Sequence, residues 1–232
     1  MTKQANRFEV AQVVAAVVAV CLAAVLVACQ TTRQTRSVQA QGFLRNYSQL
    51  REGKGKEAQL IYINPSANWQ RYDSIMIDSV SIWYGSKTEE LPAKDRKALT
   101  DVLYNALHKQ LGQDYDIVNY PGPRTMRLRA AITEAKGARV VGNTVTTIVP
   151  QARMLSTLTG LATDTQVFVG KAAIEVEITD SMTGKRLAAA VDERAGAKTL
   201  RGIGGKWKDV DNAFKYWAER IQKRLAELRA ER

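Results

Sequence analysis

The chain has 232 residues, and 34 basic against 23 acidic side chains give it a formal net charge of +11. A hydrophobic content of 45% is enough for one domain, or two small ones, with a real core. Two cysteines and one histidine argue against a disulfide scaffold and against most metal sites built on these residues.

An apolar stretch runs from Val13 to Ala28 behind a short leader that contains two cations. It is too short for a membrane-spanning helix of about 20 residues, and it ends in small residues. The run from Leu26 to Cys29, LVAC, resembles the lipobox of bacterial lipoproteins. The resemblance implies cleavage before Cys29, acylation of its thiol and a mature protein anchored on the periplasmic side. We therefore expect residues 1–28 to be a signal peptide.

The mature chain is still basic. Residues 1–28 contain two basic residues and one acidic residue, so 32 and 22 remain and the formal net charge becomes +10. Cys21 leaves with the leader and Cys29 carries lipid, so no thiol remains for a disulfide. Export argues against nucleic acid as a partner, and the reachable anions are lipid head groups, envelope polymers and acidic proteins. Gln30, in the place of an inner-membrane retention Asp, favours the outer membrane.

Residues 29–41 are polar and have no hydrophobic period, which is typical of a tether. A segment of this length reaches at most about 40 Å. From residue 42 onwards we expect a single periplasmic domain, residues 42–232.

The first predicted strands of this domain are β-branched runs at 59–63 and 74–83. In the second run the apolar parity changes between Ile77 and Val80, which predicts a bulge near Asp78. The other predicted elements are a helix between Pro92 and Gly112, strands over 126–133 and 140–149, a weaker helix over 151–161, a hairpin of strands 171–179 and 187–191, and a long helix over 207–228.

These strands alternate in hydrophobicity, so each has one buried face. The element order therefore predicts the α+β class, with a mostly antiparallel sheet and helices packed on one face.

Residues along nearly the whole mature chain resemble one known family. They are Gly42, Phe43, Leu44, Tyr47, Ser48, Leu50, Tyr62, Asn64, Pro65, Tyr72, Asp73, Glu175, Val176, Glu177, Asp180, Ser181, Thr183, Gly184, Asp192, Arg194 and Gly196. The pattern resembles the bacterial lipoproteins grouped as domain of unknown function 3313, a family with no assigned activity, so no catalytic residue can be carried over from it. The element order also resembles periplasmic accessory lipoproteins with a TolB amino-terminal-like sheet.

No pattern for catalysis stands out. His108, the one histidine, lies on a predicted helix, where a surface position explains it. Glu175 and Glu177 could form a carboxylate pair for glycan cleavage. Both glutamates alternate with the apolar residues of their strand and so point away from its apolar face. We therefore expect both to be solvated and ionised.

Two basic features are candidates for binding an anion or a partner. Arg124, Arg127 and Arg129 give one strand a basic face. Lys206 ends the glycine-rich run 201–206 before the last helix, and a helix N-terminus attracts anions. A solvated strand face and a hinge would explain the same residues. We name these four side chains as the candidate anion or partner surface.

We predict no cofactor, no metal and no nucleic-acid partner. The leading hypothesis is a non-enzymatic, lipid-anchored module that docks onto an envelope protein or an anionic envelope polymer. The second is an envelope hydrolase whose carboxylates meet only in the fold. The third is a carrier of lipid or another apolar ligand, which needs a sizeable apolar cavity between the sheet and the helix over 207–228. We expect Trp207 and Trp217 of that helix to lie in the core.

Overall fold

The computed structural model describes residues 32–35, 37–83, 91–137, 139–141, 166–168, 170–196 and 207–231. A nine-stranded sheet has the neighbour order β2-β3-β11-β10-β7-β4-β6, with β1 also paired to β11 and β5 to β7. Its strands are β1 (Thr32–Gln34), β2 (Arg51–Glu52), β3 (Leu60–Ile63), β4 (Ser74–Ile77), β5 (Ser81–Ile82), β6 (Asp116–Ile117), β7 (Thr125–Lys136), β10 (Lys171–Asp180) and β11 (Arg186–Gly196). The helices are α2 (Ala93–Leu111), α4 (Lys208–Ala230) and the 3-10 turn η1 (Trp69–Arg71).

The sheet is mixed, so the expectation of a mostly antiparallel sheet is wrong. Five strand pairs are antiparallel, but β4 pairs in parallel with β6 and β7, and β5 in parallel with β7. The cause is α2, which carries the chain from β5 back to the end of the sheet where β6 begins. Parallel neighbours require such a crossover, and local hydrophobic alternation does not reveal it.

The predicted bulge near Asp78 is confirmed. Ile77 lies opposite Leu128 of β7, whereas Ser81 lies opposite Ala131. The interruption between β4 and β5 therefore holds one residue more than the facing part of β7. The extra residue keeps the apolar side chains on both sides of it inside: Ile75, Ile77, Val80 and Ile82 are all buried.

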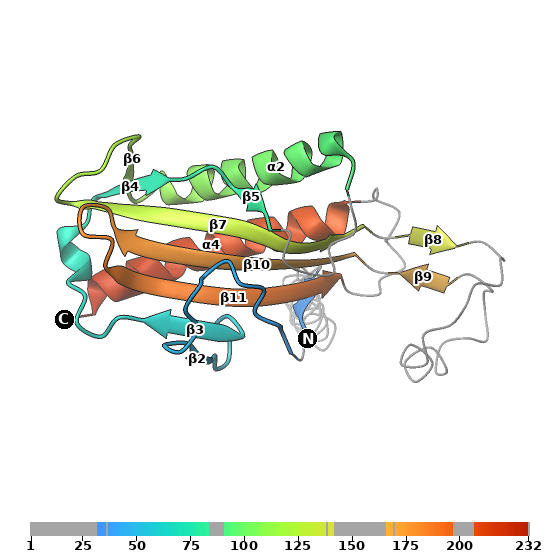
Figure 1. Cartoon of the computed structure of the whole chain (residues 1–232), viewed down its shortest axis with the longest axis horizontal. Coiled ribbons are helices and arrows are strands. Elements are labelled where there is room, and N and C mark those ends of the chain that lie inside the picture. Colours follow the sequence, from blue (N-terminus) through green and yellow to red (C-terminus); the bar gives the residue numbers. More distant parts are fainter. Residues whose placement is uncertain are drawn as a thin grey trace, which may run out of the picture. The chain divides into compact units, whose positions relative to one another are not determined.

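The main core lies between the sheet and the two helices, which Figure 1 shows on the same face. Each helix turns an apolar stripe inward, as its spacing of three and four residues predicts. The buried members of these stripes include Leu99, Leu103, Leu107 and Leu111 of α2 and Val210, Phe214, Trp217, Leu225 and Leu228 of α4. Trp207 is partly buried against this core.

The other face of the sheet is covered by the chain that precedes β2. Figure 1 shows this segment, residues 37–50, crossing β10 and β11 on the side away from the helices. Phe43 and Leu44 are buried there against Ala189 and Val191 of β11. The sheet therefore has a second, smaller core, and this part of its second face is covered rather than solvated.

Strand pairing begins at Thr32, within the segment 29–41 that the sequence predicts to be a tether. β1 pairs with the last residues of β11. Arg194, which is 4% exposed, donates to the hydroxyl and carbonyl oxygens of Thr32, and its guanidinium lies 3.6 Å from the ring centre of Tyr216 on α4. Residues 32–34 thus belong to the sheet.

Both long helices, predicted over 92–112 and 207–228, are confirmed as α2 and α4, and so is the hairpin of β10 and β11. Residues Arg139–Val141 (β8) pair with Gln166–Phe168 (β9) in a separate two-stranded ladder. The rest of the strand predicted over 140–149 and the helix predicted over 151–161 lie outside the described residues. None of the helices that the structure describes is long and apolar enough to cross a membrane.

Candidate functional site

The arginines of the candidate basic surface each face a carboxylate. Arg127 donates through Nε and Nη2 to the two oxygens of Asp78, at 2.9 and 2.8 Å, and this carboxylate raises the pKa of Arg127. Arg129 donates to Glu177 at 3.1 Å, and Arg124 pairs with the aspartate before β4. The structure thus brings the three arginines together, at the start of β7 and along one of its faces. Each positive charge is paired with a neighbouring carboxylate. Lys206 lies outside the described residues.

Glu175 is fully buried, so the expectation that it is solvated is wrong. It lies on the second face, beneath the segment 37–50. Its Oε1 accepts from the amide of Gln41 at 2.5 Å, and its Oε2 accepts from the amide of Leu44 at 3.1 Å and the hydroxyl of Tyr47 at 2.5 Å. Burial, together with the hydrogen bond to Glu175, raises the pKa of Tyr47 to about 12. The carboxylate fastens the segment to the sheet.

Glu177 is also buried, at 9% exposure, which corrects the second half of that expectation. Arg129 and Arg186 donate to its two oxygens, Arg186 at 2.7 Å. Arg186 also donates to the carbonyl oxygens of Leu44 and Asn46. The two glutamates therefore clamp the covering segment rather than offering a free acid and a free nucleophile, and this cluster gives no support to the hydrolase hypothesis.

The single histidine lies on the surface of α2, as predicted. Within the part of the chain that the structure describes, no three His, Cys, Asp or Glu side chains come together as a metal site requires.

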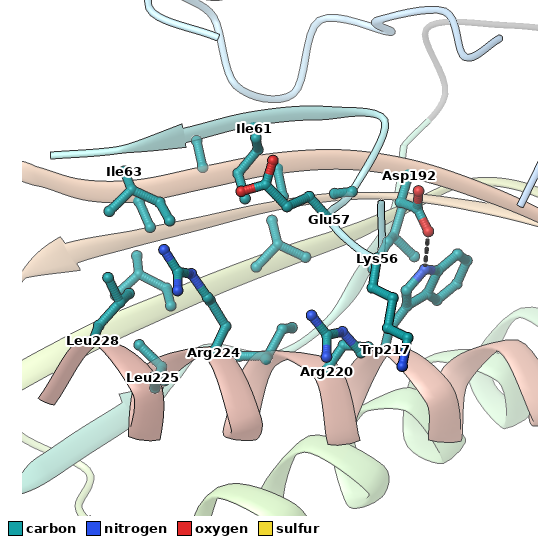
Figure 2. Close-up of a pocket in the computed structure, with 18 of the residues that line it drawn as sticks. Lys56, Glu57, Ile61, Ile63, Asp192, Trp217, Arg220, Arg224, Leu225 and Leu228 are labelled. Carbon is teal, nitrogen blue, oxygen red and sulfur yellow. Dashed lines mark hydrogen bonds between the residues drawn. The ribbon is translucent and has the colours of Figure 1, made fainter. Parts of the chain in front are cut away.

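A groove lies open between α4 and the sheet (Figure 2). Its cavity volume is about 110 Å³. The walls are mainly aliphatic: Ile61 and Ile63 of β3, Ile174, Val176 and Ile178 of β10, Ala188 and Ala190 of β11, and Ile221, Leu225 and Leu228 of α4.

The groove exists because β11 contributes small side chains to the face that α4 covers. The register between β10 and β11 shifts after Ile178, and beyond the shift Ala188 and Ala190 face α4. Hydrophobic alternation along the sequence does not reveal this, because the neighbouring Ala189 and Val191 lie on the opposite face, in the second core. Three successive alanines were the signal in the sequence, but the face they would line depended on the irregular pairing.

Charged side chains from the loop before β3 and from α4 form the rim. Lys56, Glu57, Arg220 and Arg224 all border the groove. Glu57 is held by Arg51 through two bonds of 2.8 and 3.0 Å, which lower its pKa to about 2. The side chains of Lys56 and Arg220 have neither a hydrogen bond nor an ion pair with any residue that the structure describes.

A buried carboxylate closes one end of the groove. Asp192 is 4% exposed; its Oδ2 accepts from Nε1 of Trp217 at 2.7 Å, the bond drawn in Figure 2. Its Oδ1 accepts from the side-chain amide of Gln34 at 2.5 Å and the backbone amide of Gln59 at 3.1 Å. Burial raises the pKa of Asp192 in spite of these donors. Strand β1 and the rim loop thus meet at this end.

Fold and groove together define an α/β domain with a mixed sheet, two helices on one face and an aliphatic groove. Beside the groove lie Lys56 and Arg220, two cations without a side-chain partner among the described residues. The chain belongs to the family of proteins of unknown function DUF3313, whose sequence profile matches residues 39–221. A search of curated proteins finds no match.

Solved structures with a similar arrangement share little sequence with this chain. The PelC L103M dodecamer from Paraburkholderia phytofirmans is 14% identical, with 70% of this chain and 94% of that chain covered and a TM-score of 0.39. A DUF4136 family protein from Bacteroides thetaiotaomicron is 10% identical, with 72% and 94% covered and a TM-score of 0.31. Likeness of this degree does not transfer a function.

Proposed function

We propose that this protein is a lipid-anchored, non-enzymatic binding module of the cell envelope, and that the groove beside α4 receives an apolar group. The main support for a binding function is the groove, because its aliphatic walls are open to a ligand whereas the neighbouring core is tightly packed. Covering apolar surface contributes about 25 cal/mol per Å².

The size of the groove limits what it can hold. An apolar cavity of about 150 Å³ accommodates one benzene molecule, whereas pockets that enclose whole ligands measure about 300–1,000 Å³. At about 110 Å³ the groove fits a short alkyl segment or one side chain. It supports binding of part of a ligand, and it gives little support to a carrier that encloses a lipid.

The anchor is the second part of the proposal. The lipobox-like run ending at Cys29 supports removal of residues 1–28 and acylation of the thiol, and Gln30 favours the outer membrane. One acyl chain binds a membrane only marginally, so the several chains of a lipoprotein are what make attachment durable. We also propose that the sheet has a TolB amino-terminal-like arrangement and that the anchored module docks onto an envelope protein or an anionic envelope polymer.

Replacement of the acylated residue tests the anchor. Cys29→Ala should leave the leader uncut or release the protein from the membrane. Fractionation of cells followed by mass spectrometry of the N-terminus distinguishes these forms. A processed Cys29→Ala protein that remains in the membrane fraction like the wild type would contradict anchoring by lipid.

Filling the groove tests the binding function. Ala190→Leu adds three carbons to the groove floor, and Ala226→Leu adds the same three to an exposed position of α4 outside the groove. We expect a photoreactive twelve-carbon alcohol to label groove peptides of the full-length protein in phosphatidylcholine nanodiscs. Ala190→Leu should reduce this labelling about tenfold, equivalent to about 1.4 kcal/mol, and Ala226→Leu should not. Equal labelling of all three proteins, each with a wild-type circular dichroism spectrum, would reject the groove as a binding site.

A further inference from the structure

We infer that the groove binds the alkyl chain of a single-chain anionic amphiphile, with its carboxylate or phosphate beside Lys56 and Arg220. The inference rests on the proposed function and names the ligand class of the same groove.

The charges at the rim determine the sign of the head group. Glu57 is neutralised by Arg51, and Asp192 is buried and accepts three hydrogen bonds. This leaves Lys56 and Arg220 as cations without a partner among the described residues. Figure 2 shows Lys56 reaching from its loop towards α4, where Arg220 lies. An anion between them would gain two charge-assisted bonds.

A third donor at the rim is also unsatisfied. The Nη1 of Arg224 pairs with Glu227 and Glu231 at 3.0 and 3.2 Å, but its Nε is buried without a hydrogen-bond partner in the described structure. Buried donors are nearly always satisfied in folded proteins, and here the described residues supply no acceptor for this donor beside the groove wall. Arg220 and Arg224 are one turn apart on α4, on the same face as the groove.

The walls favour an alkyl chain over a peptide. They are aliphatic along β3, β10 and the second half of α4, and the polar groups gather at the rim and at Asp192. A peptide backbone in such a groove would leave its amides without partners, which is costly, whereas an alkyl chain has no polar group to satisfy. The volume admits part of one chain, so two-chain lipids would have to leave the second chain outside.

Competition between head groups tests the inference. The photoreactive alcohol is bound to the full-length protein in phosphatidylcholine nanodiscs and displaced with dodecanoate, dodecyl phosphate or dodecanol. The comparison uses the double variant Lys56→Gln/Arg220→Gln against the control Lys54→Gln/Lys223→Gln, which removes the same charge from exposed positions off the groove. Because the two variants have the same net charge, each competitor partitions into the bilayer to the same extent with either of them. This partitioning therefore cancels when the two variants are compared.

In the wild type and the control, at least one of the two anions should displace the probe at about tenfold lower concentration than dodecanol, as expected for two partly exposed ion pairs. In Lys56→Gln/Arg220→Gln the anions and dodecanol should displace the probe at about the same concentration. In the wild type the difference between them should become smaller at high salt. Preference for dodecanoate would identify a fatty acid, and preference for dodecyl phosphate a phospholipid-type head group.

Equal displacement by dodecanol and both anions in the wild type, with groove labelling intact, would overturn the inference and leave the proposed function standing. Displacement by an acidic amphipathic peptide but by neither anion would overturn it in favour of a protein ligand. Groove labelling that Ala190→Leu does not reduce would overturn both.

Discussion

Replacement of Glu175 by Gln tests the role of the buried carboxylate on the second face of the sheet. The carboxylate accepts three hydrogen bonds, two from backbone amides and one from Tyr47. A hydrogen bond to a charged group contributes about 1.5–3 kcal/mol. Gln keeps one acceptor oxygen and turns a donor towards the remaining groups, so at least one bond is lost. We expect the free energy of unfolding to fall by about 2–4 kcal/mol.

Urea unfolding of the full-length protein, followed by tryptophan fluorescence, measures this change. Amide hydrogen exchange adds a local measurement, because residues 38–50 should exchange faster in Glu175→Gln while α2 should not. Glu219→Gln, on the exposed side of α4, is the matched control and should lie within about 0.5 kcal/mol of the wild type. If Glu175→Gln were equally silent in both measurements, the clamp would be refuted.

Three further changes test other contacts. The pKa of Glu57 is lowered from its usual 4.5 to about 2, so the pair with Arg51 stabilises the fold above pH 4.5 and loses this contribution as the pH falls towards 2. Glu57→Gln should therefore make the free energy of unfolding less dependent on pH between pH 6 and pH 3, and the change should be small because the pair is partly exposed to solvent. An unchanged pH dependence would argue against the pair. Trp217→Phe removes the donor to Asp192 and should cost about 2 kcal/mol in urea unfolding; wild-type stability would show that the bond contributes nothing. Arg194→Lys loses the two-oxygen contact with Thr32, so the amides of residues 32–34 should exchange faster, and unchanged exchange would mean that backbone pairing alone holds β1.

Local patterns in the sequence predict the elements of this fold because each element has one dominant buried face. Periods of two and of three to four residues located the main strands and both helices, and the parity change after Ile77 located the bulge. Parallel pairing of β4 and β5 with β7 depends on the path of the chain through α2, which no local period records.

The errors at the site have the same physical origin. The residues that cover Glu175 come from an aperiodic segment more than 100 positions away, so alternation along β10 could not show that its second face is buried. Arg127 and Asp78 are 49 positions apart, and their pairing follows from the parallel register. The groove depends on a register shift at Ile178, one residue of irregularity that exchanges the inner and outer faces of β11.

The most direct test of the central claim is to identify what the groove holds in cells. The full-length protein is purified in nanodiscs without added ligand, and small molecules that remain bound are identified by native mass spectrometry for the wild type, Ala190→Leu and Ala226→Leu. We expect an alkyl-chain anion bound to the wild type and to Ala226→Leu and absent from Ala190→Leu. The same bound molecules in all three proteins, or none in any, would contradict a ligand site beside α4.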